Sequence, residues 1–292
     1  MRSFNTLRSI SLSLFCLLAA AATHAEPVEQ VMEKFDKVVR DSFHSSVSQL
    51  KLTTCKYRIQ NDAMKCSEKP REVLVEMVQK DYGPRMRDSR TLADVIAPIS
   101  DRGIGTLTYD YEQYDKDKDM WLYLPALGKV KRLISNSDGS ENFFGSEFLT
   151  ENMENRKLQD YTYKTIDETT YNQRPVYVVE WTPKSEKLRK SPFSKIESFI
   201  DKERYVPMKE NFYNHNGRLY LQQIWLVQEM VDGVWIGRKV TMNNLISQRV
   251  SQLQTESVKF HIDISDEFFT QRSLTDFVYR ENRMTGLRAL WN

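Results

Sequence analysis

Hydrophobic residues near the beginning of the chain recur at the spacing of an α-helix. Between residues 27 and 39 they fall on one stripe and polar residues fall on the other side, the apolar positions being Val28, Val31, Met32, Phe35, Val38 and Val39. Pro27 suits the first turn of a helix, because a proline at that position gives up no hydrogen bond. The pattern predicts an amphipathic N-terminal helix.

Farther along the chain the hydrophobic period changes to two, which is the period of a β-strand. Val73, Val75 and Met77 alternate with their neighbours in this way. Further strand candidates are residues 106–113, 120–124, 157–166, 175–181, 195–200, 208–213, 219–229, 234–243 and 252–262. Polar or glycine-bearing breaks separate these runs, as in an antiparallel meander. Since no linker, low-complexity tract or repeat divides residues 26–292, we expect one domain there.

This many consecutive strands with few helices favour a strongly curved antiparallel sheet, or half-open barrel. An open sheet of this kind has an apolar concave face that other segments must cover. The N-terminal helix and the irregular segment 135–155 are the expected cover. After Asp266, Phe268, Phe269, Leu274 and Phe277 are expected to hold the end of the chain against the sheet. The predicted fold class is therefore mainly β with a few helices.

A motif lies in residues 121–132, where a tryptophan-containing strand runs into a turn and a basic strand returns. Leu124, Pro125, Leu127 and Gly128 form the turn, and an aromatic segment around Gly145 follows at residues 142–148. In this order the elements resemble the LolA-like outer-membrane lipoprotein-sorting family. The resemblance implies a half-barrel with a helical lid. It also implies a resistance-nodulation-division family exporter in the inner membrane as a partner, because that branch of the family often accompanies such exporters.

Residues 1–25 have the pattern of a cleaved secretory signal peptide: Arg2 and Arg8, an apolar run from Ile10 to Ala22, and small residues before Glu26. Cleavage removes two of the 42 basic residues and none of the 40 acidic ones, so the mature chain is neutral. A neutral protein has no net field that attracts nucleic acid. We therefore predict a periplasmic protein that does not bind nucleic acid.

Two cysteines remain after this cleavage, Cys55 and Cys66, in an oxidising compartment. Residues 60–63 between them are a turn candidate, and opposed residues of a hairpin come close enough to bridge. The pair lacks the tight spacing or neighbouring histidines of a metal or redox site. We predict a structural disulfide.

Residues suited to catalysis are not grouped in the sequence. No nucleophile elbow, phosphate loop, dinucleotide fingerprint or zinc-binding helix occurs, and His44, His215 and His261 are scattered. Residues 115–119 resemble the start of a calcium loop, but Met120 stands where that loop needs glycine. The prediction is a protein that is not an enzyme, with no cofactor and no metal.

Several strands are apolar on both faces, so each needs cover on both sides or holds a ligand on one. Trp121 and Tyr123 share one face of their strand, opposite Leu122 and Leu124, and two further strands contribute Trp181 and Trp225. These four aromatic residues are the candidates for lining an apolar cavity. Packing within the protein core is the alternative for each of them.

Phe143, Phe144 and Phe148, beside Gly139 and Gly145, complete the candidate ligand-binding set. They could form a movable flap or a fixed plug at the end of the barrel. A basic group, Lys129, Lys131 and Arg132, follows the turn. It could meet anionic headgroups or an acidic partner, or be a solvated strand edge.

Two functions fit these observations. The first is a periplasmic carrier that shelters the acyl chains of a lipid or lipoprotein and transfers them toward the outer membrane. The second is an accessory protein that docks on the exporter and whose cavity is filled by its own lid. A lipid adduct on the purified protein distinguishes the first from the second.

Overall fold

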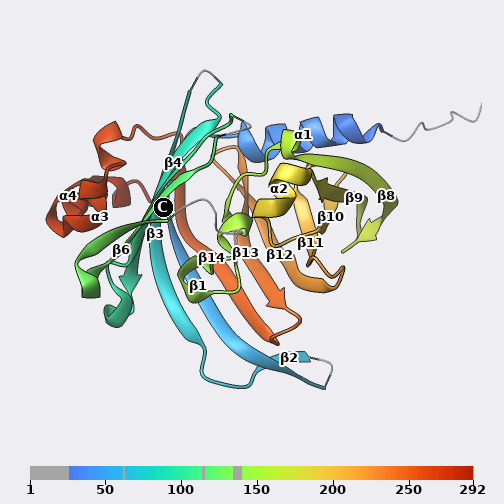
Figure 1. Ribbon diagram of the computed structural model, residues 1–292, viewed down its shortest axis with the longest axis horizontal. Helices are drawn as coiled ribbons and strands as arrows, with labels where there is room; N and C mark the ends of the chain where they lie inside the picture. The colour runs from blue at the N-terminus through green and yellow to red at the C-terminus, as the bar shows by residue number, and fades with distance from the viewer. Residues whose placement is uncertain (1–25, 62, 84, 114–115, 134–139, 292) are drawn as a thin grey trace, which may run out of the picture.

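The computed structural model describes residues 26–61, 63–83, 85–113, 116–133 and 140–291. The predicted signal segment and Gly139 lie outside these residues. The N-terminal helix is confirmed as α1 (Val28–Arg40), which begins after Pro27. Val31, Met32 and Phe35 on its apolar stripe are buried. Figure 1 shows α1 lying along the rim of a curved sheet.

The sheet is antiparallel, has 14 strands and follows the order β7-β6-β5-β4-β3-β1-β14-β13-β12-β11-β10-β9-β8, with β2 paired to β1. Because β7 and β8 are its two edges, it does not close into a barrel. The strands are β1 (Ser45–Gln60), β2 (Ala63–Cys66), β3 (Arg71–Tyr82), β4 (Asp88–Ala97), β5 (Gly105–Asp110), β6 (Asp119–Leu124), β7 (Lys129–Leu133), β8 (Tyr161–Tyr171), β9 (Arg174–Pro183), β10 (Lys195–Asp201), β11 (Pro207–Tyr213), β12 (Leu219–Val231), β13 (Val234–Asn244) and β14 (Arg249–Phe260). The predicted fold class is confirmed.

The predicted strands agree with the observed ones to within a few residues, although β4 was not predicted, and two further differences are informative. The first is that residues 157–160 precede β8 and include a short 3₁₀ turn, Leu158–Asp160. The second is that β1, at the centre of the sheet between β3 and β14, was recognised only at its hairpin end. Ser46 and Ser48 are buried in β1, and these polar residues interrupt the apolar alternation that marks a half-buried strand.

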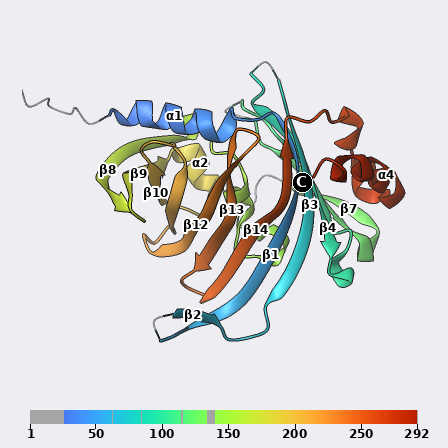
Figure 2. The ribbon, with the colours of Figure 1, turned by 180° about the vertical axis from the view of Figure 1, so that it is seen from behind.

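Two separate cores lie on the two faces of the sheet. The concave core joins α1 to strand residues such as Leu52, Val75 and Trp181 and to the irregular segment between β7 and β8. The convex core lies under α3 (Gln271–Thr275) and α4 (Phe277–Arg288) and contains Val47, Val78 and Leu107. Figures 1 and 2 show α3 and α4 outside the curve of the sheet and α2 (Ser185–Lys190) inside it.

The C-terminal segment holds the chain end against the sheet largely as expected. Phe268, Phe269 and Leu274 are buried in the convex core. Phe277 is 47% exposed, so its predicted role in this core is wrong. It is the first residue of α4, where its ring lies beside Arg102 and Arg280 and not under the helix. In the part of the chain that the structure describes, no helix is long and apolar enough to cross a membrane.

The predicted disulfide between Cys55 and Cys66 is present, with the Cα atoms 5.8 Å apart. It joins β1 to the β2 arm of the hairpin. Closing a loop of this length in the unfolded chain stabilises the folded state by about 3 kcal/mol. Cys55 is buried and Cys66 is exposed, so a reductant can reach the bond from the hairpin side.

Reduction of this disulfide is expected to lower the free energy of unfolding by about 3 kcal/mol. Urea denaturation with and without dithiothreitol measures the difference. The double variant Cys55→Ser, Cys66→Ser should start at the lower stability and show no response to the reductant. Equal stabilities of the oxidised and reduced protein would contradict the expectation.

Buried charges connect α4 to the convex face. Asp94 of β4 forms an ion pair with Arg280 at 3.0 Å, and both side chains are less than one-tenth exposed. One carboxylate oxygen of Asp94 has no hydrogen-bond partner among the described residues. Burial raises the pKa of Asp94 to about 7; Arg280 and Arg102 oppose the rise, and Glu76 and Glu281 add to it.

Stability is therefore expected to depend on the titration of Asp94. Between its usual pKa near 4 and about 7, the folded chain holds a proton that the unfolded chain releases. The contribution of Asp94 to stability is complete below this window and is lost as the pH rises through it, by at most about 1.4 kcal/mol per pH unit. Asp94→Asn should remove this slope from a denaturation series between pH 5 and 7.5. Parallel curves for the variant and the unaltered protein would contradict the assignment.

Candidate functional site

The segment between β7 and β8 enters the curve of the sheet and forms a lid over its concave face. We define the lid as residues 140–157. It contains two short 3₁₀ turns, Phe143–Gly145 and Thr150–Met153. Phe148 and Leu149 are almost fully buried and belong to the concave core. The lid is thus part of the folded interior.

Glu147 attaches the middle of the lid to β13 and β14. Its carboxylate accepts hydrogen bonds from Asn244 at 2.8 Å and from Arg249 at 2.7 Å. Its backbone N–H donates to the hydroxyl of Ser251 at 2.8 Å. Glu147 is 7% exposed. A carboxylate removed from water needs such partners, so this contact fixes the position of the lid.

Arg156 attaches the end of the lid to β11. Its guanidinium makes a two-pronged ion pair with Glu210, with one of the two N–O distances at 2.7 Å. Ser198 donates a further hydrogen bond to the same carboxylate at 2.7 Å. The guanidinium lies 5.3 Å from the ring centre of Trp181 and 5.6 Å from that of Phe212. Planar pairing and stacking of this kind need an arginine.

The first turn of the lid has an unusual backbone. Phe144 and Gly145 both have positive φ angles, 47° and 73°. A Cβ atom on Gly145 would lie 3.1 Å from the Nη1 atom of Arg71. That nitrogen donates a hydrogen bond to the carbonyl of Phe144 at 2.8 Å. The motif glycine therefore allows Arg71 to hold the turn from outside.

The main cavity lies between this turn and the concave face of β3 to β6. Its volume is about 440 Å³. The wall from the sheet is mainly apolar or hydroxyl-bearing, with Arg71, Gln79 and Asp110 as its other polar residues, and the lid supplies Phe143 and Phe144. The residues of β4, β5 and β6 that face it are Ser89, Thr91, Ala93, Val95, Thr106, Thr108, Asp110, Met120, Leu122 and Leu124. The cavity has the size of a small-molecule site.

A second cavity of about 270 Å³ lies between α1 and strands β11 to β14. Phe148 and Trp225 contribute to its wall, but so do Asp36 of α1 and the Arg156–Glu210 pair. It meets the same part of the lid as the main cavity, at residues 153–155. The lid therefore separates an apolar cavity from a more polar one.

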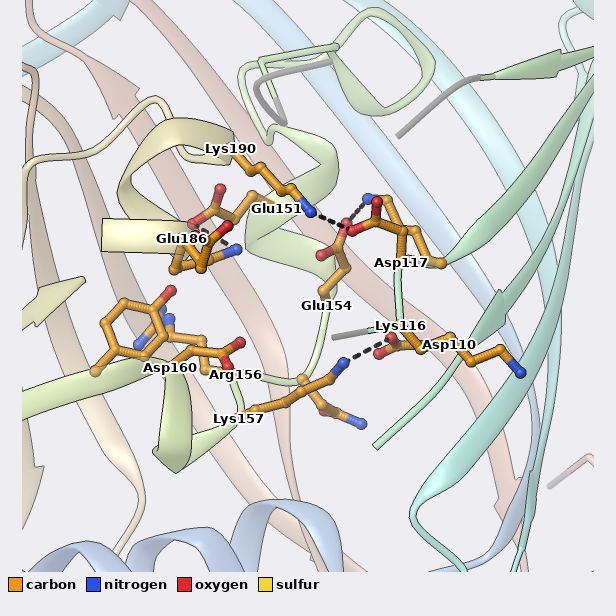
Figure 3. A pocket seen from close by; sticks show the side chains of 14 residues that line it. Asp110, Lys116, Asp117, Glu151, Glu154, Arg156, Lys157, Asp160, Glu186 and Lys190 are labelled. Atoms are coloured by element: carbon orange, nitrogen blue, oxygen red, sulfur yellow. Dashed lines mark hydrogen bonds and ion pairs between the residues drawn. The ribbon is translucent and has the colours of Figure 1, made fainter. Parts of the chain in front are cut away.

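A polar cavity of about 120 Å³ lies where the β5–β6 hairpin, the lid and α2 meet (Figure 3). Lys190 of α2 pairs with Asp117 at 2.6 Å, and Lys118 pairs with Glu154 of the lid. Glu151 is buried and accepts a hydrogen bond from Ser191; burial raises its pKa. These contacts tie the hairpin across the opening of the sheet to α2.

The histidines take part in structural contacts. His44 lies 3.4 Å from Asp81, while His215 and His261 contact backbone carbonyls at 2.9 Å and 3.2 Å. Within residues 26–291, gaps aside, no group of three or more His, Cys, Asp or Glu side chains is arranged to hold a metal ion. The segment that resembles a calcium loop includes Asp115, which lies outside the described residues.

The structure separates the predicted ligand-binding residues. Phe143 and Phe144 line the main cavity, and Phe148 and Trp225 line the second one. Trp181 is completely buried in the concave core, where its ring contacts Phe35, Tyr161 and Tyr163. Among the two alternatives for Trp181, packing in the core is the one observed.

Trp121 and Tyr123 need a correction, because they do not line the cavity. They lie on the convex face in the core beneath α3 and α4, and Trp121 packs against Tyr109. The residues that alternate with them, Leu122 and Leu124, face the cavity. The alternation predicted correctly which residues share a face of β6. The prediction that the face with the aromatic residues lines the cavity was wrong.

Of the two predicted forms of the phenylalanine segment, the fixed plug fits Phe148, and the movable flap stays a prediction. Phe148 is a buried plug, whereas Phe143 and Phe144 form a wall of the main cavity.

In the motif, Leu124 faces the cavity, and the turn Pro125–Leu127 leaves Leu127 64% exposed. Gly128 ends that turn with a φ of 58°. The main cavity also has polar lining residues, Thr91, Thr106 and Thr108. Nothing in the sequence marked them apart from the alternation of the strands.

A family model matches residues 87–276 of this sequence. That range is more than half of the chain, and the model describes a family of uncharacterised proteins. The chain belongs to this family. No curated protein matches it.

Solved structures of other proteins have a similar fold. A DUF1329 family protein from Desulfovibrio piger is 22% identical with a TM-score of 0.73, covering 84% of this chain and 98% of its own. A domain from Vibrio parahaemolyticus, described as outer-membrane lipoprotein-sorting, is 21% identical with a TM-score of 0.72 and covers 84% and 97%. A LolA superfamily protein from Nitrosomonas europaea is 18% identical with a TM-score of 0.63 and covers 84% and 98%. These similarities confirm that the chain has the LolA-like fold that the motif predicted.

Proposed function

We propose that this protein is a periplasmic carrier that shelters the acyl part of a lipid or lipoprotein and transfers it toward the outer membrane. The observation that carries the proposal is the main cavity, an apolar space of about 440 Å³ within a LolA-like fold. A carrier needs an apolar space that is reached without breaking the core. The cavity meets this requirement, because its walls are the lid turn and one sheet face.

The expected affinity suits a carrier that must also release its cargo. Burying ten methylenes at about 0.8 kcal/mol each gives about 8 kcal/mol. That free energy corresponds to a dissociation constant of about 1 μM before ordering costs. Because apolar contact holds the acyl chain without a covalent bond, its release needs no chemical step.

The periplasmic location and the partner are part of the proposal. The signal segment and the Cys55–Cys66 disulfide support the location, because disulfides persist in oxidising compartments. A resistance-nodulation-division family exporter is proposed as partner on the ground of the family resemblance alone.

The lid distinguishes this function from that of a non-carrying accessory protein. The accessory hypothesis needs a cavity that the lid itself fills. Phe148 and Leu149 do enter the core, but space remains beside Phe143 and Phe144. This remaining space favours the carrier.

Binding of a fluorescent acyl probe tests the proposal directly. Dansyl-undecanoic acid added to delipidated protein should gain fluorescence with saturation near 1 μM, and palmitate should displace it. Heat-unfolded protein is the control for non-specific binding. A folded protein that binds neither probe nor palmitate would contradict the proposal.

A further inference from the structure

The volume of the main cavity limits the number of acyl chains that it can hold. A methylene occupies nearly the volume of a liquid water molecule, about 30 Å³. The cavity of about 440 Å³ therefore has room for about 15 methylenes, which is one ordinary acyl chain. Three chains of that length need about three times this space.

The second cavity is unsuited to another chain. It holds less volume, about 270 Å³, and its wall includes Asp36, Arg40 and the Arg156–Glu210 pair. These groups are ion-paired within the protein, Asp36 with Arg87 and Arg156 with Glu210, and a methylene chain would still cost free energy by removing the water around them. Between the two cavities the lid is held by Glu147 and Arg156, so the cavities are not free to merge.

The charges at the rim of the main cavity indicate the headgroup. Lys129 and Lys131 of β7 pair directly with Leu124 and Leu122 of β6, which line the cavity. Directly opposed residues of an antiparallel pair share a face, with Cβ atoms about 5 Å apart. Both lysines therefore project from the cavity side of the sheet. Both are exposed, and neither has an ion-pair partner within the described ranges.

The carboxylates around the cavity leave these lysines available. Asp101 pairs with Arg71, Glu154 with Lys118, and Asp110 with Lys157 at 3.6 Å. The remaining carboxylate of the lining, Glu141, is exposed to water. Arg132 of the same strand faces the other side and pairs with Asp119. Among the described residues, the rim thus offers two ammonium groups without an ion-pair partner beside the cavity.

We propose that the ligand of the main cavity is a single-chain anionic lipid, with its carboxylate or phosphate held by Lys129 and Lys131. The inference rests on the proposed carrier function and narrows it. It excludes triacylated lipoprotein anchors as the cargo of this cavity. The lysine stems cover the apolar edge while their ammonium groups reach the headgroup.

Competition against dansyl-undecanoic acid tests the number of chains and the headgroup. The competitors are palmitate, lysophosphatidylglycerol, uncharged monopalmitoylglycerol and a tripalmitoyl lipopeptide. The two anionic single-chain lipids should displace the probe at one lipid per protein, and their comparison distinguishes a carboxylate source from a phosphate source. The uncharged lipid should bind about five-fold more weakly, and the lipopeptide about ten-fold or more.

A charge-matched pair of variants tests the lysines. Lys131→Gln removes one positive charge on the cavity side, and Arg132→Gln removes one on the convex side. Lys131→Gln, and more strongly Lys129→Gln combined with it, should erase the preference for anionic over uncharged single-chain lipid. Arg132→Gln should keep the preference. Retention of the preference in the double lysine variant would overturn the headgroup assignment.

The outcomes separate this inference from the proposed function. Equal affinity for the tripalmitoyl lipopeptide would overturn the single-chain limit and leave a lipid carrier. Binding of no competitor and no probe would overturn the carrier function, and the inference with it. One anionic chain per protein, with the lysine dependence, supports both.

Discussion

Thr106→Trp is expected to weaken acyl-chain binding about thirty-fold while the protein stays folded. Thr106 lies in the floor of the main cavity on β5, directly opposite Ala93 on one neighbouring strand and Leu122 on the other. An indole at this position takes the space of two or three methylenes. Each is worth about 0.8 kcal/mol, or about 2 kcal/mol together, which corresponds to about thirty-fold in Kd.

The matched control for this variant is Thr169→Trp. Thr169 lies on the edge strand β8, is exposed, and is not part of the cavity wall. Titration of both variants with dansyl-undecanoic acid, together with thermal unfolding, separates a filled cavity from a damaged fold. Unaltered affinity in Thr106→Trp would show that acyl chains bind elsewhere.

Arg156→Leu is expected to lower the free energy of unfolding by about 3–5 kcal/mol. The substitution removes the cationic partner of Glu210, whose carboxylate is 2% exposed and keeps only the hydrogen bond from Ser198. The cost comes mainly from the uncompensated charge left in the interior. The double variant Arg156→Leu, Glu210→Leu should recover part of the loss, because it removes that charge as well.

Arg132→Leu is the control for the ion pair. It breaks a pair of the same chemistry with Asp119, but Arg132 is 65% exposed, so the expected loss is below about 1 kcal/mol. Urea denaturation of the three variants measures the differences. If Arg156→Leu costs no more than Arg132→Leu, the lid is not anchored by this ion pair.

Local patterns were sufficient to predict much of the framework. The helical stripe of α1 and the alternation of most strands depend on neighbouring residues, and the structure confirms them. The hairpin that brings Cys55 and Cys66 together is local as well. In contrast, the serines of β1 obscured its alternation, although the strand lies at the centre of the sheet.

The cavity residues depend on contacts between distant parts of the chain, which alternation does not reveal. Trp121 and Leu122 lie on opposite faces of β6, and both faces are apolar. The helices α3 and α4 cover the face that carries Trp121, which leaves the other face to line the cavity. These helices lie more than 140 positions away along the sequence. The position of the lid also depends on a distant contact, because Glu210 is 54 residues from Arg156. Neither partner is marked by a local pattern.

Native mass spectrometry of the mature protein, purified under mild conditions from a periplasmic extract, tests the carrier function most directly. The protein is expected to carry a lipid adduct that leaves on extraction with organic solvent, and the extract identifies the cargo. A mass equal to that of the polypeptide alone, unchanged after incubation with mixed bacterial lipids, would contradict the carrier function.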